Sequence, residues 1–190
     1  MDEVPLHSLL ATRWSPTTFD ATRSVRPEQV ESLLQAARWA PSAGNSQPWA
    51  FIVGVRDDRD HRRLVRHLAA SAGRWAPDAA LLVANLAHRH VADTDWDYSE
   101  FASYDLGQAV AHVTLQARSL GMYLRQFRAF DREALAREFE VPDHWEIATM
   151  SAIGWVPRGS EPKAREKQQE RERRPLDDLR WPAADLADRS

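Results

Sequence analysis

Three short stretches of the sequence gather side chains that could hold a small polar ligand. The first, APSAGNSQPW (40–49), sets hydroxyl and amide groups, which can both donate and accept hydrogen bonds, between two prolines. Gly44 permits unusual backbone angles, while the prolines stiffen the loop. Such a loop could recognise a planar heterocycle or a polyol. Taken alone, however, Ser42 and Asn45 are explained more simply as satisfying the backbone around a helix stop.

The second stretch, TRWSPTTF (12–19), combines a guanidinium with hydroxyl groups within a few positions. Arg13 can offer a bidentate fork to a phosphate, and Ser15 and Thr17 can add hydroxyl donors, a combination that suits a phosphate monoester. A surface turn capped by serine and threonine would explain the same residues. Both interpretations therefore stay open at this point.

The third stretch, RERRPL (171–176), carries Arg171 and Arg173 two positions apart, so an extended backbone would direct both to one side. They could complete a phosphate clamp if the fold brings them beside Arg13. Alternatively, the stretch is a solvated charge run in which neighbouring glutamates pair with the arginines at little gain. A contact with nucleic acid is a further alternative, which the interspersed glutamates disfavour.

The sequence lacks the residues that several familiar catalytic and metal-binding sites require. The 190 residues include no cysteine, which excludes disulfides, thiolate metal sites and a cysteine nucleophile. The chain has no Gly-rich phosphate loop, no dinucleotide fingerprint and no GxSxG elbow. The histidines of HRH (88–90) share one side of an extended chain, but they lack HExxH or comparable spacing. We therefore expect no metal site and no catalytic residue of these classes.

The composition narrows the class of protein. Lysine and arginine number 25 against 28 aspartates and glutamates, and this net charge of -3 gives no general reason to expect nucleic acid or a membrane surface as a partner. The longest apolar runs fall far short of the roughly 20 residues of a membrane span. The first residues lack the features of a signal peptide. We expect a soluble, cytoplasmic protein with a single domain over residues 1–190.

Hydrophobic periodicity predicts the elements that must position these stretches. We expect helices over 6–10, 27–40, 56–73, 101–120 and 131–140, and strands over 50–55, 80–85 and 147–156. The charged segment 56–73 is expected to face mostly solvent. Gly121 suits the residue that ends the long helix, and Asp131 suits an N-cap. The mixture favours an α+β or α/β arrangement in three layers, with the long helix buried, one candidate partner being a second copy of itself.

Taken together and in order, these segments resemble the FMN-dependent nitroreductase family. The resemblance runs through nearly the whole chain, in TRWSPTTF, AARWAPSAGNSQPWAFIV, DLGQAVAHVTLQARSLGM, FRAFD, AIGW and RERRPLDDL. The order of helix, APSxxNxQPW loop and apolar strand is its most specific part. The resemblance implies an α+β fold, a three-layer α/β/α sandwich, and an intertwined homodimer with one FMN in each of two clefts between subunits.

The resemblance also implies roles for particular residues. Contacts with the phosphate and ribityl end of FMN fall to Arg13, Trp14, Ser15 and Thr17, with Arg171 and Arg173 completing the phosphate clamp. From the other subunit, Pro41, Ser42, Ala43 and Asn45 would approach the flavin, and Gln47 would brace their loop. Phe127, Arg128 and Ala129 would run along the flavin edge, where the Ala129 amide is the candidate hydrogen-bond donor to flavin N5.

The chemistry implied by the resemblance belongs largely to the cofactor. NAD(P)H would supply the hydride, and a small acceptor, nitroaromatic or quinone, would take up the electrons in a ping-pong cycle. No side chain need act as acid or base, while Arg125 or Arg128 could stabilise the anionic reduced ring. The alternative is a protein that binds or sequesters flavin without efficient turnover.

Overall fold

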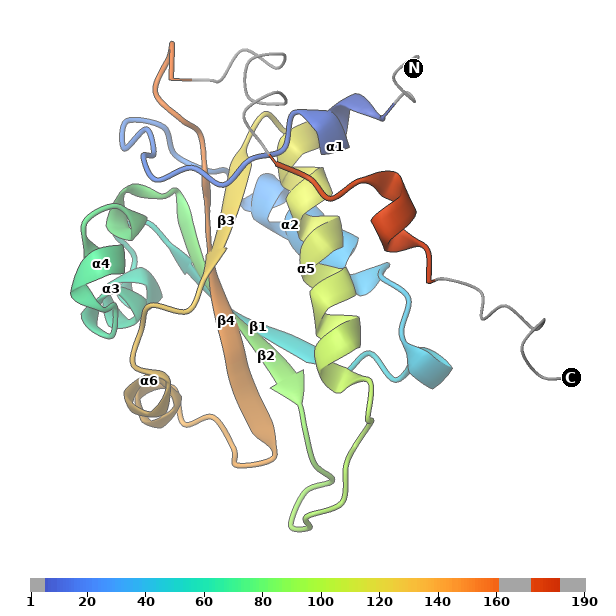
Figure 1. Ribbon diagram of the computed structural model, residues 1–190. Coiled ribbons are helices and arrows are strands. Elements are labelled where there is room, and N and C mark those ends of the chain that lie inside the picture. Colours follow the sequence, from blue (N-terminus) through green and yellow to red (C-terminus); the bar gives the residue numbers. More distant parts are fainter. Residues whose placement is uncertain (1–5, 161–171, 182–190) are drawn as a thin grey trace, which may run out of the picture.

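The computed structural model describes residues 6–160 and 172–181 (Figure 1). Its helices are α1 (Ser8–Ala11), α2 (Pro27–Arg38), α3 (Arg59–Arg66), α4 (Ala70–Gly73), α5 (Ala102–Ser119) and α6 (Arg132–Glu138). Its strands are β1 (Trp49–Val55), β2 (Leu81–His88), β3 (Tyr123–Phe127) and β4 (Trp145–Gly154). Short 3-10 turns are η1 (Ala43–Asn45), η2 (Ala76–Asp78) and η3 (Leu176–Leu179).

The strands form a single antiparallel sheet in the order β1-β2-β4-β3. Strand β2 lies inside this sheet, and its residues 81–87 are buried, which explains their nearly continuous apolar sequence. The exception in that run is Asn85, whose amide Nδ2 donates to Thr149 Oγ1 at 3.0 Å and to Ser151 Oγ at 2.9 Å on β4. Its partners satisfy the buried amide donor, so a polar residue is tolerated at the centre of the sheet.

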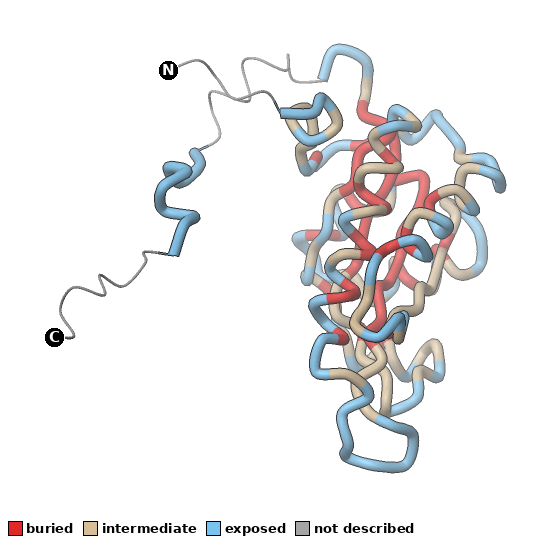
Figure 2. Tube along the Cα trace, turned by 90° about the vertical axis from the view of Figure 1, so that its right-hand side faces the viewer, coloured by how far each residue is buried: buried red, intermediate tan, exposed pale blue. Residues whose placement is uncertain are grey.

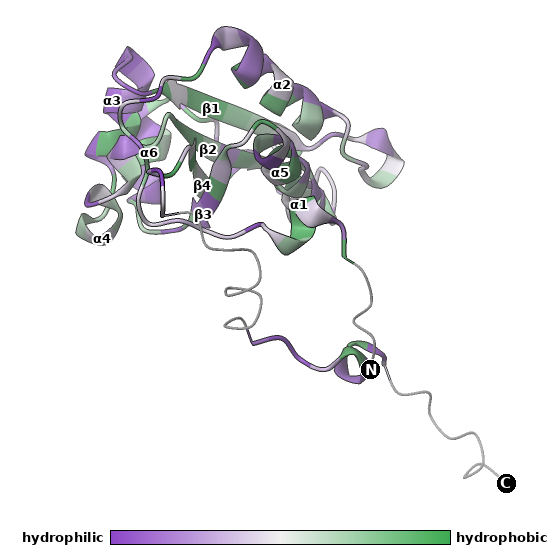
Figure 3. Cartoon of the chain, turned by 90° about the horizontal axis from the view of Figure 1, so that it is seen from above, coloured by the Kyte–Doolittle hydropathy of each residue, from purple (hydrophilic) through white to green (hydrophobic). Residues whose placement is uncertain are grey.

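Helices cover both faces of the sheet, which gives the expected three layers (Figures 1 and 3). On one face α2 and α5 pack through Leu33, Ala109 and Val113. On the other face Leu64 of α3 and Leu135 of α6 belong to a second apolar cluster. Seen from above, the strands are mostly apolar whereas α3 is strongly hydrophilic, so burial of the sheet is what organises the layers (Figure 3).

The residues predicted to begin or end three of the helices are confirmed in these positions. Gly121 follows α5 with a positive φ of 74°, a conformation that costs glycine little and that lets the chain turn back into β3. The side chain of Asp131 accepts a hydrogen bond from the Ala134 amide at 3.0 Å and so caps α6. Pro27 occupies the start of α2 as expected.

Two expectations about the elements were wrong. The sequence interpretation had three strands and missed β3, which pairs with β4 at the edge of the sheet. It also had one helix over 56–73, but the chain leaves α3 at Arg66 so that Leu68 can form a β-bridge with Phe130, and α4 begins afterwards. Most residues of α3 are exposed or half-buried, as expected, while His61 and Leu64 of this helix are buried.

The described part of the C-terminal region, residues 172–181, is exposed throughout and stands apart from the buried core (Figure 2). Leu176, Leu179 and Trp181 present apolar side chains there that are 66%, 61% and 94% exposed. Within the described ranges, no helix has both the length and the apolar character that crossing a membrane requires.

Candidate functional site

Arg13 and Ser15 face a hollow of about 310 Å³ that lies between the N-terminal segment, the outer side of α5 and β3. Its remaining walls are Leu10, Ala111, Thr114, Leu115, Leu124 and Gln126. Arg13 is half-buried, and its Nη1 lies 3.4 Å from Ser15 Oγ. Thr17 is exposed beyond Pro16, which is buried. The structure therefore brings two of the predicted phosphate contacts, Arg13 and Ser15, to one hollow.

Two further arginines hold this N-terminal segment in place. Arg118 of α5 reaches Thr12 Oγ1 at 3.4 Å, and its guanidinium carbon lies 3.9 Å from the centroid of the Tyr123 ring. The ring of Trp14 packs edge-on against the same Tyr123, with centroids 5.7 Å apart. Arg125 of β3 donates to the main chain at Ser15. Three guanidinium groups thus gather around the segment, which makes this region favourable for an anion.

The loop that the sequence singled out has an unusual backbone. Gly44, Asn45 and Gln47 all have positive φ, at 57°, 56° and 47°. Asparagine tolerates this region better than glutamine does, so the conformation is strained at Gln47. Side-chain contacts inside the loop include the backbone amide of Gln47, which donates to Ser42 Oγ at 3.0 Å, and the Gln47 side chain, whose Nε2 lies 3.3 Å from Asn45 Oδ1. The side chain of Gln47 thus contacts Asn45 within the loop, and its bracing role stays a prediction.

Most of the loop is open to solvent. Pro41, Asn45 and Gln47 are exposed, while Ser42 and Ala43 are half-buried. The polar atoms of Asn45 are therefore accessible to a ligand or to a second polypeptide in this conformation.

The loop and the Arg13 segment lie at opposite ends of α5 within one protomer (Figure 1). The loop contacts the first turn of α5, where the Ala43 amide donates to Asp105. The N-terminal segment contacts the last turn, through Arg118. Residues 105 and 118 are thirteen positions apart, which corresponds to about 20 Å along a helix. One protomer thus separates the two groups of predicted contacts by most of the length of α5.

In the FRAFD stretch some side chains pack against aromatic rings, while the main chain at Ala129 offers hydrogen-bonding groups. Phe127, the last residue of β3, packs edge-on against Trp75 with centroids 5.1 Å apart. Arg128 is exposed and folds back over the ring of Phe130, 4.8 Å from its centroid. The Ala129 carbonyl accepts the Ala69 amide at 3.0 Å. No hydrogen bond among the described residues uses the Ala129 amide, so that donor remains available to a ligand.

Of the two arginines predicted to complete the phosphate clamp, only Arg173 lies within the described residues, and it does not line the hollow in this protomer. Arg173 is exposed, and its Nη1 donates to the carbonyl of its neighbour Glu172 at 2.8 Å. Arg173 is not among the residues that line the hollow with Arg13. Arg171 lies outside the described residues. The role proposed for this pair stays a prediction.

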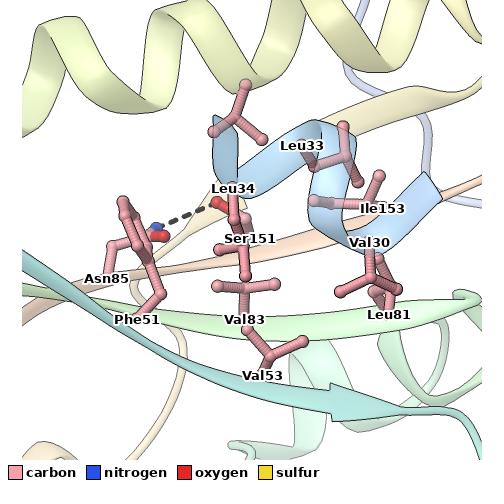
Figure 4. A pocket seen from close by; sticks show the side chains of 11 residues that line it. Val30, Leu33, Leu34, Phe51, Val53, Leu81, Val83, Asn85, Ser151 and Ile153 are labelled. Carbon is pink, nitrogen blue, oxygen red and sulfur yellow. Dashed lines mark hydrogen bonds between the residues drawn. The ribbon is translucent and has the colours of Figure 1, made fainter. Parts of the chain in front are cut away.

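A second hollow, beneath α2, is part of the core (Figure 4). Apolar residues of α2, α5 and three strands line it, together with Asn85 and Ser151, whose side chains are joined by a hydrogen bond. Its volume is about 20 Å³, which is room for roughly one water molecule. A flavin ring cannot enter such a space, so this hollow is not a candidate cofactor site.

His88, the first histidine of HRH, serves packing. His88 is stacked between Tyr98 and Trp145, with ring centroids 3.8 Å and 4.5 Å away. Burial, together with the nearby His144, lowers the pKa of His88 and so favours its neutral form. Within residues 6–160 and 172–181, no group of three or more histidine, aspartate or glutamate side chains could hold a metal ion.

Sequence reasoning missed three residues that contact the predicted site segments. Asp105 and Tyr98 contact the 41–47 loop, and Arg118 contacts the N-terminal segment. An acidic residue in the first turn of a helix is common, so Asp105 gave no signal for a partner 62 positions away. Tyr98 lies in the irregular stretch 88–100, where no periodicity indicates its neighbours.

Comparison with known proteins agrees with this arrangement. Residues 10–85, which carry both the Arg13 segment and the strained loop, match the model of the Nitroreductase family. A protein of Archaeoglobus fulgidus with the provisional name NADH dehydrogenase/NAD(P)H nitroreductase is 29% identical over 137 residues, covering 70% of this chain and 75% of that protein. These matches confirm the resemblance to the nitroreductase family.

Two further proteins that resemble this chain add detail on the fold and on the range of activities. A solved structure described as an oxidoreductase containing FMN has a TM-score of 0.82 and 28% identity, with 95% of this chain and 93% of that chain covered. A 5,6-dimethylbenzimidazole synthase of Rhodospirillum rubrum is 29% identical over 160 residues, covering 71% and 74% of the two chains. Proteins similar to this chain thus include different activities, and similarity alone does not define the acceptor.

Proposed function

We propose that the protein is an FMN-dependent oxidoreductase that uses NAD(P)H to reduce small acceptors of the nitroaromatic or quinone type. The observation that carries the proposal is the hollow that Arg13 and Ser15 line, in a segment that Arg118 and Arg125 hold by hydrogen bonds to Thr12 and Ser15. The FMN in a relative of 28% identity that covers 95% of this chain supports the choice of cofactor.

The hollow suits the phosphate end of FMN. Arg13 could meet two phosphate oxygens with its fork, and Ser15 could donate from its hydroxyl. Both side chains already lie at the hollow, so binding would require little rearrangement of the segment. Arg118 and Arg125 would contribute positive potential while they hold the segment.

A second copy of the chain would bring the strained loop to this hollow. If two α5 helices pack antiparallel, the first turn of one lies beside the last turn of the other. Asn45 of one protomer would then face the hollow that contains Arg13 of its partner. Within a single protomer the two residues cannot meet, because they lie at opposite ends of α5. The proposed site is therefore shared between two protomers.

The outer side of α5 has the features of a helix-packing surface. Gly107 and Ala111 are exposed one turn apart, and a Cβ at Gly107 would meet nothing within 4 Å in the protomer. Small residues at this spacing allow two helices to approach closely. Tyr104, on the same side, is 69% exposed. Apolar area of this kind on α5, together with Leu179 and Trp181, supports a covering partner, and we propose an intertwined homodimer.

The chain itself would bind and orient rather than transfer protons. When bound, FMN would supply the redox chemistry, accepting hydride from NAD(P)H and reducing the acceptor in a separate half-reaction. The Ala129 amide, at the end of β3, is available to donate a hydrogen bond to the flavin edge. Arg128 is exposed next to it and could add positive potential there.

Steady-state kinetics with a quinone test this proposal. Purified protein loaded with FMN should oxidise NADH or NADPH in the presence of menadione, and double-reciprocal plots at several menadione concentrations should be parallel, as a ping-pong cycle requires. Protein that binds FMN but gives no turnover with either nucleotide would point to the alternative, a protein that sequesters flavin. Protein that does not bind FMN would exclude both.

A further inference from the structure

The strained loop 42–47 is held from outside by two contacts with distant parts of the chain. We propose that Asp105 and Tyr98 are positioning residues that keep this loop in the conformation that binds FMN. The inference rests on the proposed function, since it concerns the same site. Neither residue is proposed to touch the cofactor.

The need for external anchors follows from the backbone of the loop. Gly44, Asn45 and Gln47 have positive φ within four consecutive residues. Non-glycine residues in this region cost free energy and persist only when the surroundings over-determine them. The contacts inside the loop join its residues 42, 43, 45, 46 and 47 only to one another, so they cannot fix the loop relative to the rest of the protein.

Asp105 supplies the first anchor, from the first turn of α5. Its side chain is only 2% exposed, and its Oδ2 accepts the amide of Ala43 at 3.0 Å. Its other oxygen, Oδ1, lies 3.3 Å from Gln108 Nε2. The positive end of the helix dipole favours a carboxylate at this position. A hydrogen bond to a buried charged acceptor is stronger than one between neutral groups, so Asp105 ties Ala43 firmly to α5.

Tyr98 supplies the second anchor, from the segment that follows β2. Its hydroxyl donates to the Ser46 carbonyl at 3.1 Å. Its ring is stacked on His88, with an interplanar angle of 19°, and His88 is stacked in turn on Trp145 at 10°. His88 and Trp145 face each other across the β2 and β4 pair, so the phenol is supported by the end of the sheet.

The two anchors bracket the residues that matter for the proposed site. Ala43 and Ser46 are the attachment points, and Gly44 and Asn45 lie between them. Because α5 and the sheet hold the loop on its two sides, Asn45 is presented in one orientation. Loss of either anchor would let the strained residues relax to ordinary backbone angles and move the Asn45 side chain.

The test is the affinity of Asp105→Ala for FMN, measured by fluorescence titration beside thermal unfolding of the apoprotein. The matched control is Asp58→Ala, which removes a carboxylate that also accepts a backbone amide, that of His61, but far from the loop. Both variants should unfold at a lower temperature. Only Asp105→Ala should weaken FMN binding, by about tenfold or more. Asp105→Asn should bind FMN more tightly than Asp105→Ala, because the amide oxygen of asparagine can still accept a hydrogen bond from the Ala43 backbone amide. Equal FMN affinities of the two alanine variants would overturn the assignment.

A double variant separates positioning from general destabilisation. If Asp105 acts through the loop that carries Asn45, then Asp105→Ala should change FMN affinity little in an Asn45→Ala background. Independent roles would instead multiply the two effects. Tyr98→Phe, which removes only the hydroxyl, should behave like a milder Asp105→Ala and should likewise have little effect in the Asn45→Ala background. Multiplicative effects for both pairs would contradict the proposal.

Failure of this inference differs from failure of the proposed function. Wild-type protein that does not bind FMN would exclude the function and the positioning roles together. Wild-type protein that binds FMN tightly, alongside variants of Asp105 and Tyr98 with unchanged affinity, would exclude only the positioning roles.

Discussion

Arg125 Nη1 donates to the carbonyl of Ser15 at 3.1 Å and so joins β3 to a segment 110 positions earlier in the chain. The guanidinium carbon of Arg125 also lies 5.1 Å from the centroid of the Trp75 ring. Because Ser15 and Arg13 line the same hollow, this contact helps to set the position of the proposed phosphate-binding groups.

Replacing Arg125 by methionine should therefore weaken FMN binding. The side chain keeps similar length but loses the donor to Ser15 and a positive charge, so we expect the dissociation constant for FMN to rise by about tenfold. Arg59→Met is the control, because Arg59 is exposed on α3 and does not line the hollow. Titration of each apoprotein with FMN checks the prediction, which an unchanged dissociation constant for Arg125→Met would refute.

A bulky charged residue at Gly107 should separate the proposed dimer. In the protomer a Cβ at this position meets nothing within 4 Å, so Gly107→Arg should fold. Between two closely packed α5 helices the same side chain has no room, and we expect a monomer that retains little FMN. Sedimentation velocity measures the oligomeric state. A Gly107→Arg protein that stays dimeric with full FMN occupancy would show that α5 does not form the interface.

Gly54 should be far less tolerant than Gly73. A Cβ at Gly54 would lie 2.5 Å from the backbone nitrogen of His61 and 2.6 Å from its Cα, because α3 crosses β1 closely there. We expect Gly54→Ala to lower the free energy of unfolding by about 1–3 kcal/mol. Gly73 is in α4 with open space around it, so Gly73→Ala should be neutral or stabilise by up to about 1 kcal/mol. Urea unfolding of both variants measures the two changes in the free energy of unfolding. Equal changes would contradict the close crossing of α3 over β1.

His61 should make stability depend on pH. Its side chain is 4% exposed, and burial lowers its pKa below the ordinary value. The unfolded chain then binds a proton that the folded chain does not, so the free energy of unfolding should fall as the pH drops below about 6.5. His88 has a lowered pKa as well and should contribute in the same direction.

The measurement is urea unfolding at about pH 7.5 and about pH 5.5. His61→Gln removes the titrating group while keeping a polar side chain of similar size. The variant should lose less stability than the wild type over this interval, with the remainder attributable to His88 and other groups. An equal loss in both proteins would argue that His61 is protonated as readily in the folded state as in the unfolded chain.

The sequence predicted the parts of the fold that repeat a hydrophobic pattern. Helix α5 is long and its apolar positions recur at helical spacing, so Leu106, Val110 and Val113 were expected inside and are buried. Strand β3 was missed because its five residues include Arg125 and Gln126, follow directly on a helix turn, and pair with a strand that lies later in the chain. Nothing local in the sequence specifies such a pairing.

The candidate site was predictable in its residue types but not in its geometry. Arg13 and Ser15 were expected together because they are two positions apart, and they do share a hollow. The distance from Asn45 to that hollow, by contrast, follows from the length of α5 and from the contact between Ala43 and Asp105. Contacts over 62 positions arise from the tertiary fold, which periodicity does not encode.

The central claim is that each FMN is held by Arg13 of one protomer and Asn45 of the other, and mixed dimers test it directly. Arg13→Ala and Asn45→Ala chains with different tags are refolded together, the mixed dimer is isolated by tandem purification, and bound FMN is measured. A mixed dimer of Arg13→Ala with Ser15→Ala is the control, because both substitutions damage the same half of each site.

The account predicts that each parent variant retains little FMN, that the control dimer retains equally little, and that the Arg13→Ala and Asn45→Ala dimer binds one FMN in its single intact site. A mixed dimer that binds no more FMN than its parents would contradict the shared site.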